Sequence, residues 1–228
     1  MKLSEFQTRI KMMVPNFNDS GLTDTQLTDL INDACNKVNL IAKVYKGYTD
    51  FNVVADQIVY TLSTSVPNFM GSEERGLYFL DTSSQWQKLY PKSISWIAQR
   101  FRDYLNASSI GLPQYYWLVD NELGFYPPAS TSTTAGARLY HLQKATPMSN
   151  QDHYPFNGTT TELAYLIPLD DAIIAYCRWK LSPAFGKITD LDLREREYLA
   201  EVRKGMRQIK RRPDAIKDIY NYPAYRGR

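Results

Sequence analysis

Histidine and cysteine, the residues that most often bind metals or act as nucleophiles, are few in this chain of 228 residues. His141 lies in a predicted strand and His153 in a predicted loop. Neither has a Cys or a second His at the spacing of a zinc site. Cys35 and Cys177 lie in helix-like stretches, where a thiol packs as a small apolar group. We therefore expect two ordinary imidazoles and two reduced, buried thiols.

Carboxylates offer another route to catalysis, and Asp170–Asp171 and Asp190–Asp192 are close pairs in the sequence. Neighbouring side chains on a helix point about 100° apart, which is poor for a shared site, whereas acids at a helix start complement the helix dipole. The phosphate-binding G-x-x-x-x-G-K-[ST] loop and the G-x-S-x-G nucleophile elbow are absent. We predict no enzyme activity and no catalytic, metal-binding or cofactor-binding residues. A Ser–His–Asp triad, or the carboxylate pair of a polymer-cleaving glycosidase, would assemble only in space and stays open.

Positive charge is concentrated at the C-terminal end of the chain. Residues 203–228 contain nine Lys or Arg and two Asp, whereas the other residues contain 18 basic and 22 acidic side chains. A basic end favours an acidic partner, which could be a protein or a nucleic acid. Tyr220, Tyr222 and Tyr225 could stack on bases, although no compact nucleic-acid recognition motif accompanies them. The 17 tyrosines of the chain are also typical of surfaces where proteins meet.

Two amphipathic helices are predicted at the start of the chain. Apolar residues recur at helical spacing over residues 4–14, and an S-x-x-Q capping box begins at Ser4. A second helix is predicted over residues 22–44, with a T-x-x-Q capping box at Thr23 and Gly47 as its stop.

Two more helices are predicted near the end of the chain. The first opens at Pro168, has acids near its start and bases near its end, and is apolar almost all round, so we expect it to be buried. The second runs over residues 190–211 as a charged rod with a narrow apolar stripe that includes Val202 and Ile209. Gly205 should weaken it slightly.

Strands are predicted between the two pairs of helices. From Tyr48 onward, short segments rich in β-branched and aromatic residues alternate with Gly, Pro, Ser and Asn. Residues 93–105 interrupt them with helical spacing. The segments 115–119 and 123–127 flank Asp-Asn-Glu and predict a tight hairpin, and residues 137–145 form the last strand before a long polar loop.

The sequence therefore predicts an α+β fold: a small α-helical base of about four helices, an antiparallel β-rich insertion and an extended C-terminal tail. We assign residues 1–47 and 160–212 to a helical core, residues 48–145 to the insertion with one helix, and residues 213–228 to the tail. No apolar run is long enough to span a membrane, and the N-terminus lacks the apolar region of a signal peptide.

The order of these features resembles the head-to-tail connector (adaptor) proteins of tailed bacteriophages, especially the podovirus-like adaptors with a β insertion. Five segments carry the resemblance over residues 3–205, and they stand in the family's order. They are "LTDLINDACNKVNLI" with Asn32, Asp33 and Ala34; "QIVYTL" with Tyr60 and Leu62; "LPQYYWLVDNELGFYPPAS" with Pro113, Tyr115, Phe125, Tyr126, Pro127 and Pro128; "ARLYHLQKATPMS"; and "LIPLDDAIIAYCRWKL". The C-terminus departs from the pattern, since such tails vary within the family.

The resemblance implies a structural protein that forms a ring, usually twelvefold, under the portal of the packaged capsid. Such a ring extends the DNA channel, through which packaged DNA passes without sequence-specific contact, and it docks a downstream tail or nozzle protein. The expected location is the neck of the virion, with assembly in the cytoplasm of the host bacterium and no membrane partner. Small adaptors of this kind often stay monomeric until the portal assembles them.

Two sets of contact residues follow from the resemblance and from the physics of the tail. Contacts with neighbouring copies or the tail side are expected at Tyr115, Tyr116, Trp117, Phe125 and Tyr126. Docking to the portal or a neighbour is expected at Lys210, Arg211, Arg212, Ile219, Tyr220, Tyr222, Pro223, Tyr225, Arg226 and Arg228. Ordering such a tail costs roughly 1–2 kcal/mol per residue, so a partner must supply buried surface. The alternative is a nucleic-acid-binding accessory protein that uses residues 203–228 as its binding arm.

Overall fold

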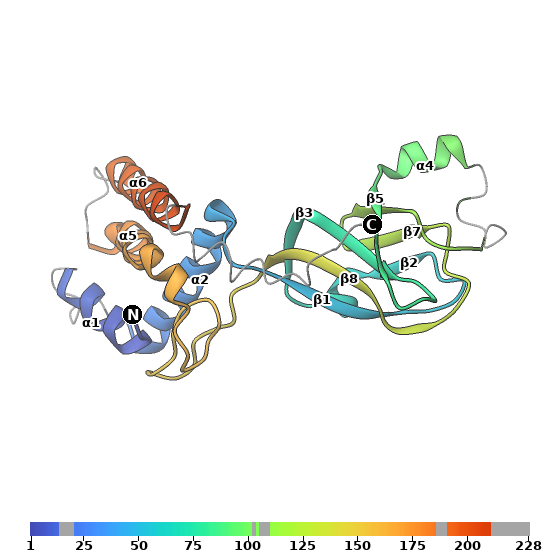
Figure 1. Ribbon diagram of the computed structural model, residues 1–228. Coiled ribbons are helices and arrows are strands. Elements are labelled where there is room, and N and C mark those ends of the chain that lie inside the picture. The colour runs from blue at the N-terminus through green and yellow to red at the C-terminus, as the bar shows by residue number, and fades with distance from the viewer. Residues whose placement is uncertain (14–20, 102–103, 105–109, 186–190, 211–228) are drawn as a thin grey trace. The chain divides into compact units, whose positions relative to one another are not determined.

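The chain forms two compact units in its computed structural model, which describes residues 1–13, 21–101, 104, 110–185 and 191–210 (Figure 1). Met1–Tyr45 and Lys144–Arg228 make up the first, which we call the helical unit, and Lys46–Gln143 make up the second, the β unit. Helices and two antiparallel-rich sheets together confirm the predicted α+β class.

The helical unit is built around one buried helix. Its elements are α1 (Leu3–Met13), α2 (Asp24–Ala42), the short 3₁₀ helices η2 (Ala164–Leu169) and η3 (Ser182–Phe185), α5 (Asp170–Leu181) and α6 (Leu191–Lys210). Helix α5 contacts α1, α2 and α6, as its almost wholly apolar sequence predicts. The core that they share includes Phe6, Ile31, Ile173 and Val202, all fully buried. Each such side chain contributes about 1.5–3 kcal/mol through burial.

The ends of α1 and α2 differ from the predictions in two places. The capping box at Thr23 is confirmed, since its hydroxyl accepts from the Gln26 N–H at 3.2 Å. The box at Ser4 is wrong, because α1 begins at Leu3 and Ser4 lies inside its first turn. The stop at Gly47 is also wrong, because α2 ends at Ala42. Its C-cap residue, Lys43, has a left-handed backbone (φ 53°) and directs its N–H to the Asn39 carbonyl. Gly47 instead pairs with β8 inside a sheet.

Helix α6 runs over the residues predicted for it and packs closely against η2. Val202 and Ile209 of its apolar stripe are buried, as the sequence indicates. Gly205 has a role that the sequence does not show. A Cβ at this position would lie 2.5 Å from the carbonyl oxygen of Pro168 and 2.7 Å from Cδ2 of Leu169, so only glycine permits this approach of the two backbones.

The β unit consists of two four-stranded sheets. The first has the order β1 (Lys46–Val53), β8 (Thr133–Gln143), β3 (Phe69–Leu80) and β4 (Trp86–Lys88), and every pair in it is antiparallel. The second has the order β2 (Val59–Thr61), β7 (Glu122–Tyr126), β6 (Tyr115–Val119) and β5 (Tyr90–Pro91), with β5 parallel to β6. A one-turn helix, α3 (Leu62–Ser65), follows β2.

Aromatic rings join the two sheets face to face. Phe51 of the first sheet lies 5.7 Å from Tyr60 and 6.2 Å from Phe125 of the second, measured between ring centroids. Leu77 and Leu139 fill the same core and are fully buried. The strand pattern thus alternates between an inner face that packs and an outer face that meets solvent.

Two predicted elements of the β unit can be compared directly with the structure. The hairpin is confirmed: β6 and β7 are joined through Asp120, whose φ of 52° is one that Asp tolerates. The predicted helix over residues 93–105 is shorter, since α4 (Ile94–Arg100) ends when Phe101 turns to extended backbone. Phe101 then stacks on Tyr126 at 4.2 Å between centroids, and this aromatic contact takes precedence over another helical turn.

Gly205→Ala tests the approach of α6 to η2. In an open helical position this change stabilises a protein by roughly 0.5–1 kcal/mol. Here we expect the opposite sign, a loss of about 1–3 kcal/mol, because the added methyl group must displace backbone. Urea unfolding measures the change. Gln208→Ala, at an exposed position of the same helix, is the control and should be nearly neutral. A Gly205→Ala variant as stable as the wild type would contradict the packing argument.

Candidate functional site

The groups best suited to catalysis serve packing in this fold. Cys35 and Cys177 are free and fully buried, as expected. Burial raises the pKa of Cys35 to about 12 and the pKa of Cys177 well above its usual value, so both thiols stay protonated at neutral pH. Among the described residues, no three His, Cys, Asp or Glu side chains gather as metal ligands do.

His141 departs from the expectation of an ordinary surface or partly buried imidazole, because it is completely buried. Its Nδ1 lies 3.1 Å from the Leu142 carbonyl oxygen and its Nε2 lies 3.0 Å from the Thr49 hydroxyl. A carbonyl only accepts, so Nδ1 carries the proton and the neutral ring accepts from Thr49. Burial lowers the pKa of His141, while the nearby Glu73 carboxylate acts in the opposite direction. The ring is therefore held in its neutral form.

The carboxylates at the start of α5 point to different partners. Asp170 is buried and accepts from the Met1 ammonium at 2.7 Å. Burial raises the pKa of Asp170 to about 6, although the ammonium lowers it. Asp171 is half-exposed and pairs with Arg9 at 3.2 Å. The two groups do not converge on one site, in agreement with their interpretation as helix N-terminal charge. Asp192 lies in the first turn of α6, and Asp190 is outside the described residues.

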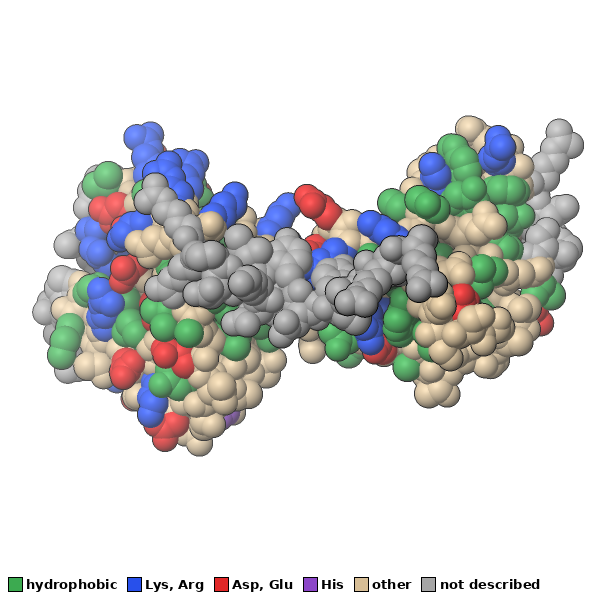
Figure 2. All heavy atoms as spheres, viewed as in Figure 1, with side chains coloured by type: hydrophobic (Ala, Val, Ile, Leu, Met, Phe, Trp, Pro, Cys, Tyr) green, Lys and Arg blue, Asp and Glu red, His purple; other side chains and the backbone are tan. Residues whose placement is uncertain are grey.

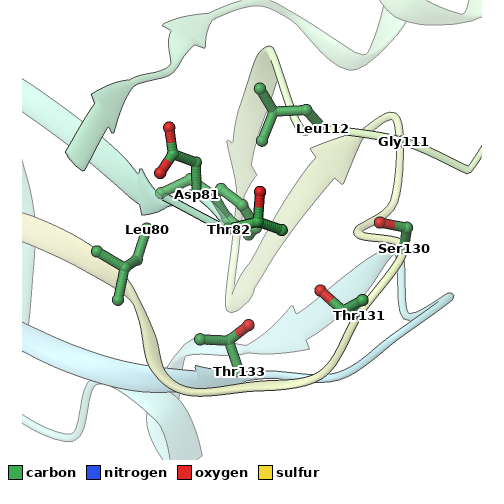
Figure 3. Close-up of a pocket in the computed structure, with 9 residues that line it drawn as sticks. Leu80, Asp81, Thr82, Gly111, Leu112, Ser130, Thr131 and Thr133 are labelled. Atoms are coloured by element: carbon green, nitrogen blue, oxygen red, sulfur yellow. The ribbon is translucent and has the colours of Figure 1, made fainter. Parts of the chain in front are cut away.

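A cavity of about 280 Å³ opens in the β unit between the end of β3 and the segments around Leu112 and Ser130 (Figure 3). Its wall mixes aliphatic side chains with the hydroxyl groups of Ser and Thr. The one carboxylate, Asp81, binds its own turn: it accepts from the N–H groups of Ser83 and Gln85 at 2.9 and 2.8 Å. These hydrogen bonds lower the pKa of Asp81, so among the described residues that line this cavity none is placed as a general acid.

Three asparagines on α2 bind the chain where it leaves and re-enters the helical unit. The side chain of Asn39 accepts from the Tyr45 N–H at 2.8 Å and donates to the Tyr45 carbonyl at 3.2 Å. Asn36 accepts from the Ala145 N–H at 2.8 Å. These contacts satisfy backbone groups that no strand pairs with at those positions. Residue 45 is the last before the β unit and residue 145 follows it closely, so one helix face binds both bordering segments of the helical unit.

Asn32 completes this set, which we call the asparagine clamp (Asn32, Asn36 and Asn39). It accepts from the Met148 N–H at 2.9 Å and donates to the Met148 carbonyl at 3.2 Å. The clamp is not predicted in the sequence analysis, although the sequence carries a signal for it. Asparagine is a poor helix former, and three of them at spacings of four and three lie on one face of an otherwise well-formed helix.

The five aromatic residues predicted to contact a neighbour or a tail protein all lie on β6 and β7, but the structure uses most of them internally. Tyr116, Trp117, Phe125 and Tyr126 are buried, at 8% exposure or less. Tyr115 is half-buried against Trp96, at 5.3 Å between ring centroids. Their contacts with other proteins stay a prediction, for which Tyr115 is the one with exposed surface.

Among the predicted docking residues, Lys210 is described and lies exposed at the end of α6. The other nine, from Arg211 to Arg228, lie outside the described residues, as does the predicted tail. Arg203, Arg207 and Lys210 recur at spacings of four and three, so they share one exposed face of α6. Figure 2 shows Lys and Arg side chains gathered over this helix. Within the described part of the chain, none of the three has an ion pair or hydrogen bond.

These observations define an α+β protein with a helical unit, an inserted β unit and a basic helix at the end of its described part. A family model described as SU10 adaptor protein matches residues 1–226, almost the whole chain. The chain therefore belongs to the SU10 adaptor protein family, and the resemblance to phage head-to-tail adaptors is confirmed. Members of this family are structural adaptor proteins of phages. No curated protein matches the chain. No helix in the described ranges has both the length and the apolar character needed to cross a membrane.

Replacing Asn39 tests the clamp. Asn39→Leu keeps the branched shape and the number of heavy atoms of the side chain but removes both bonds to Tyr45, which leaves a partly buried N–H and a partly buried C=O unsatisfied. We expect a loss of about 2–4 kcal/mol in the free energy of unfolding, measured in urea. Leu is the better helix former, so helix propensity alone predicts a gain. Lys37→Leu, at an exposed position of α2, is the control. Equal stability of the Asn39 and Lys37 variants would rule out this role for the clamp.

The lowered pKa of His141 predicts how the β unit responds to acid. The stability that neutral His141 contributes is fully present above the ordinary His pKa of about 6.5. It is lost as the pH falls from there through the lower pKa of the folded state, because in that range the unfolded chain binds the proton more readily than the folded chain does. Urea unfolding followed by tryptophan fluorescence between pH 7.5 and 5.0 should show this loss. His141→Gln should flatten the dependence by roughly 1 kcal/mol per unit of pKa shift. Identical slopes in the wild type and in His141→Gln would refute the assignment.

Proposed function

We propose that this adaptor is a head-to-tail connector that forms a ring under the portal of a tailed phage, extends the DNA channel and docks a tail or nozzle protein. The match of the adaptor family model over residues 1–226 carries this proposal. The ring is twelvefold in this proposal, in line with the family resemblance. The portal protein, neighbouring copies and the tail-side protein are its partners, and packaged DNA passes through the lumen without sequence-specific contact.

The division of the chain supports this role. The residues 1–47 and 160–212 serve as the adaptor core, the residues 48–145 add surface for contacts with neighbours and the tail side, and the residues 213–228 act as a docking strap. The strap brings three tyrosines, two prolines and a basic tip, which combine large contact area with few rotatable bonds. In this role the protein works in the neck of the virion after assembly in the bacterial cytoplasm.

A nucleic-acid-binding accessory protein is the second candidate function. The exposed basic face of α6, formed by Arg203, Arg207 and Lys210, favours it. DNA affinity measured against salt separates the two functions. A nucleic-acid-binding protein loses affinity steeply as salt rises, with a slope set by the number of phosphates that it neutralises, whereas a connector binds free DNA weakly at any salt concentration.

Co-assembly with the portal tests the first proposal. Purified chain mixed with its portal protein should give a ring attached to the portal in negative-stain micrographs. Removal of residues 213–228 should leave the thermal unfolding of the chain unchanged and weaken attachment about tenfold or more, which corresponds to about 1.4 kcal/mol per factor of ten.

The control keeps the length of the tail and removes its side chains. A Gly/Ser segment in place of residues 213–228 should fail like the deletion. Equal attachment by the full and truncated chains would eliminate the strap and leave the connector standing. Absence of any ring on an intact portal would eliminate the connector.

A further inference from the structure

The outer face of the first sheet of the β unit carries a fixed array of aromatic and charged side chains. One row crosses all four strands: Asp50 of β1, Arg138 of β8, Tyr78 of β3 and Lys88 of β4 are paired in register. Directly paired residues point to the same face of a sheet, so these side chains stand together. Arg138 binds Asp50 through two hydrogen bonds of 2.7 Å.

Rings hold this array in place. The Arg138 guanidinium lies 4.2 Å from the ring centroid of Tyr48 and 4.6 Å from that of Trp86. Tyr140 lies 5.7 Å from Tyr48 and 5.5 Å from Tyr78, measured between centroids. Tyr48 is nevertheless 52% exposed. These contacts already restrict the side chains to few rotamers before binding. Association therefore removes little side-chain entropy, which lowers its entropic cost.

The array, which we call the aromatic face, is basic. Beside Arg138 and Lys88 it carries Arg75, whose guanidinium lies 5.3 Å from the Tyr140 ring centroid, and Lys46. Lys46 and Arg75 both approach Glu73, at 3.2 and 3.8 Å. Four cations thus stand against the carboxylates of Asp50 and Glu73. Exposed Tyr, Trp and Arg are the residues that dominate protein–protein binding energy. Stabilising cross-strand pairs alone would account for the rings, but not for the excess of positive charge.

The same unit carries an acidic projection. The turn between β6 and β7 exposes the carboxylates of Asp120 and Glu122, with Val119 beside them at 39% exposure. Within the described residues, neither carboxylate has a hydrogen bond or ion pair. The turn is rigid, because Asn121 between them binds α3: its Oδ1 accepts from the Ser63 N–H at 3.0 Å, and its carbonyl accepts from the Leu62 N–H at 2.8 Å.

We propose that the acidic turn of one copy (residues 119–122) binds the aromatic face of the next copy in the ring. The inference rests on the proposed ring. Its own support is that one chain carries two unlike surfaces of opposite charge, each held rigid before binding. A ring needs this arrangement, since every subunit must offer both halves of a heterologous contact. Both halves belong to one compact unit, so their mutual geometry is fixed within each subunit.

Charge reversal in the full-length chain tests the pairing. Glu122→Lys and Lys88→Glu should each reduce the yield of closed rings on the portal about tenfold, because each opposes like charges across the contact. The double variant should recover most of the yield, since the pair is restored with its signs exchanged. Asp29→Lys, an exposed reversal on α2 of the helical unit, is the control and should not change the yield. Unfolding midpoints near that of the wild type confirm that each variant folds.

The outcomes separate the pairing from the ring itself. Tyr48→Ala and Asp120→Asn, which remove contact area or charge without reversing it, should weaken ring closure severalfold even where a reversal variant fails to fold. Wild-type yields for all of these variants would overturn the pairing and leave the connector function standing. A double variant no better than the single ones would also overturn it. A wild-type chain that forms no ring on the portal would overturn the proposed function, and the pairing with it.

Discussion

Three side-chain amides on one helix hold the chain at the points where it leaves and re-enters the helical unit. At Tyr45 and between Ala145 and Met148, backbone donors and acceptors have no strand partner, and an unsatisfied buried group costs about 1–3 kcal/mol. The asparagine clamp supplies the missing partners from α2. Because the same helix packs its apolar stripe into the core around α5, the anchoring of the insertion and the packing of the helical unit depend on one element.

The two units have separate cores. The helical unit packs around α5, whereas the β unit packs between its sheets around Phe51, Tyr60 and Phe125, and the two sets share no buried residue. A substitution on the surface of one unit therefore leaves the core of the other unit unchanged. The same division extends to buried charge. Burial raises the pKa of Asp170 in the helical unit and lowers that of His141 in the β unit, so acid affects their stabilities in opposite directions.

Periodicity in the sequence was enough to predict the α+β class, α2 with its cap, the buried α5, the length of α6 and the β6–β7 hairpin, because each depends on local pattern. Features that depend on contacts across the chain were missed. Gly205 was interpreted as a weak point of α6, yet it permits the approach to Pro168. The helix after Ser93 was predicted too long, since no local signal shows that Phe101 packs on Tyr126. The clamp was present as a spacing of asparagines, but its partners lie more than a hundred residues away for Asn32 and Asn36.

The same limit applies to surfaces. Aromatic residues in "YYWLV" and "LGFY" predict contact area from composition alone, and the fold then buries four of the five. The most exposed rings are elsewhere: Tyr48 is 52% exposed on the outer pleat of β1, where alternation puts every second residue toward solvent, and Tyr90 of β5 is 63% exposed. A high content of aromatic residues indicates that a chain binds other proteins, but only the register of the strands shows which rings face solvent and can contact a partner. For an adaptor, this means that the contact surface is set by the pairing of strands: a shift of one residue between β1 and β8 would move Tyr48 into the core and Phe51 into solvent.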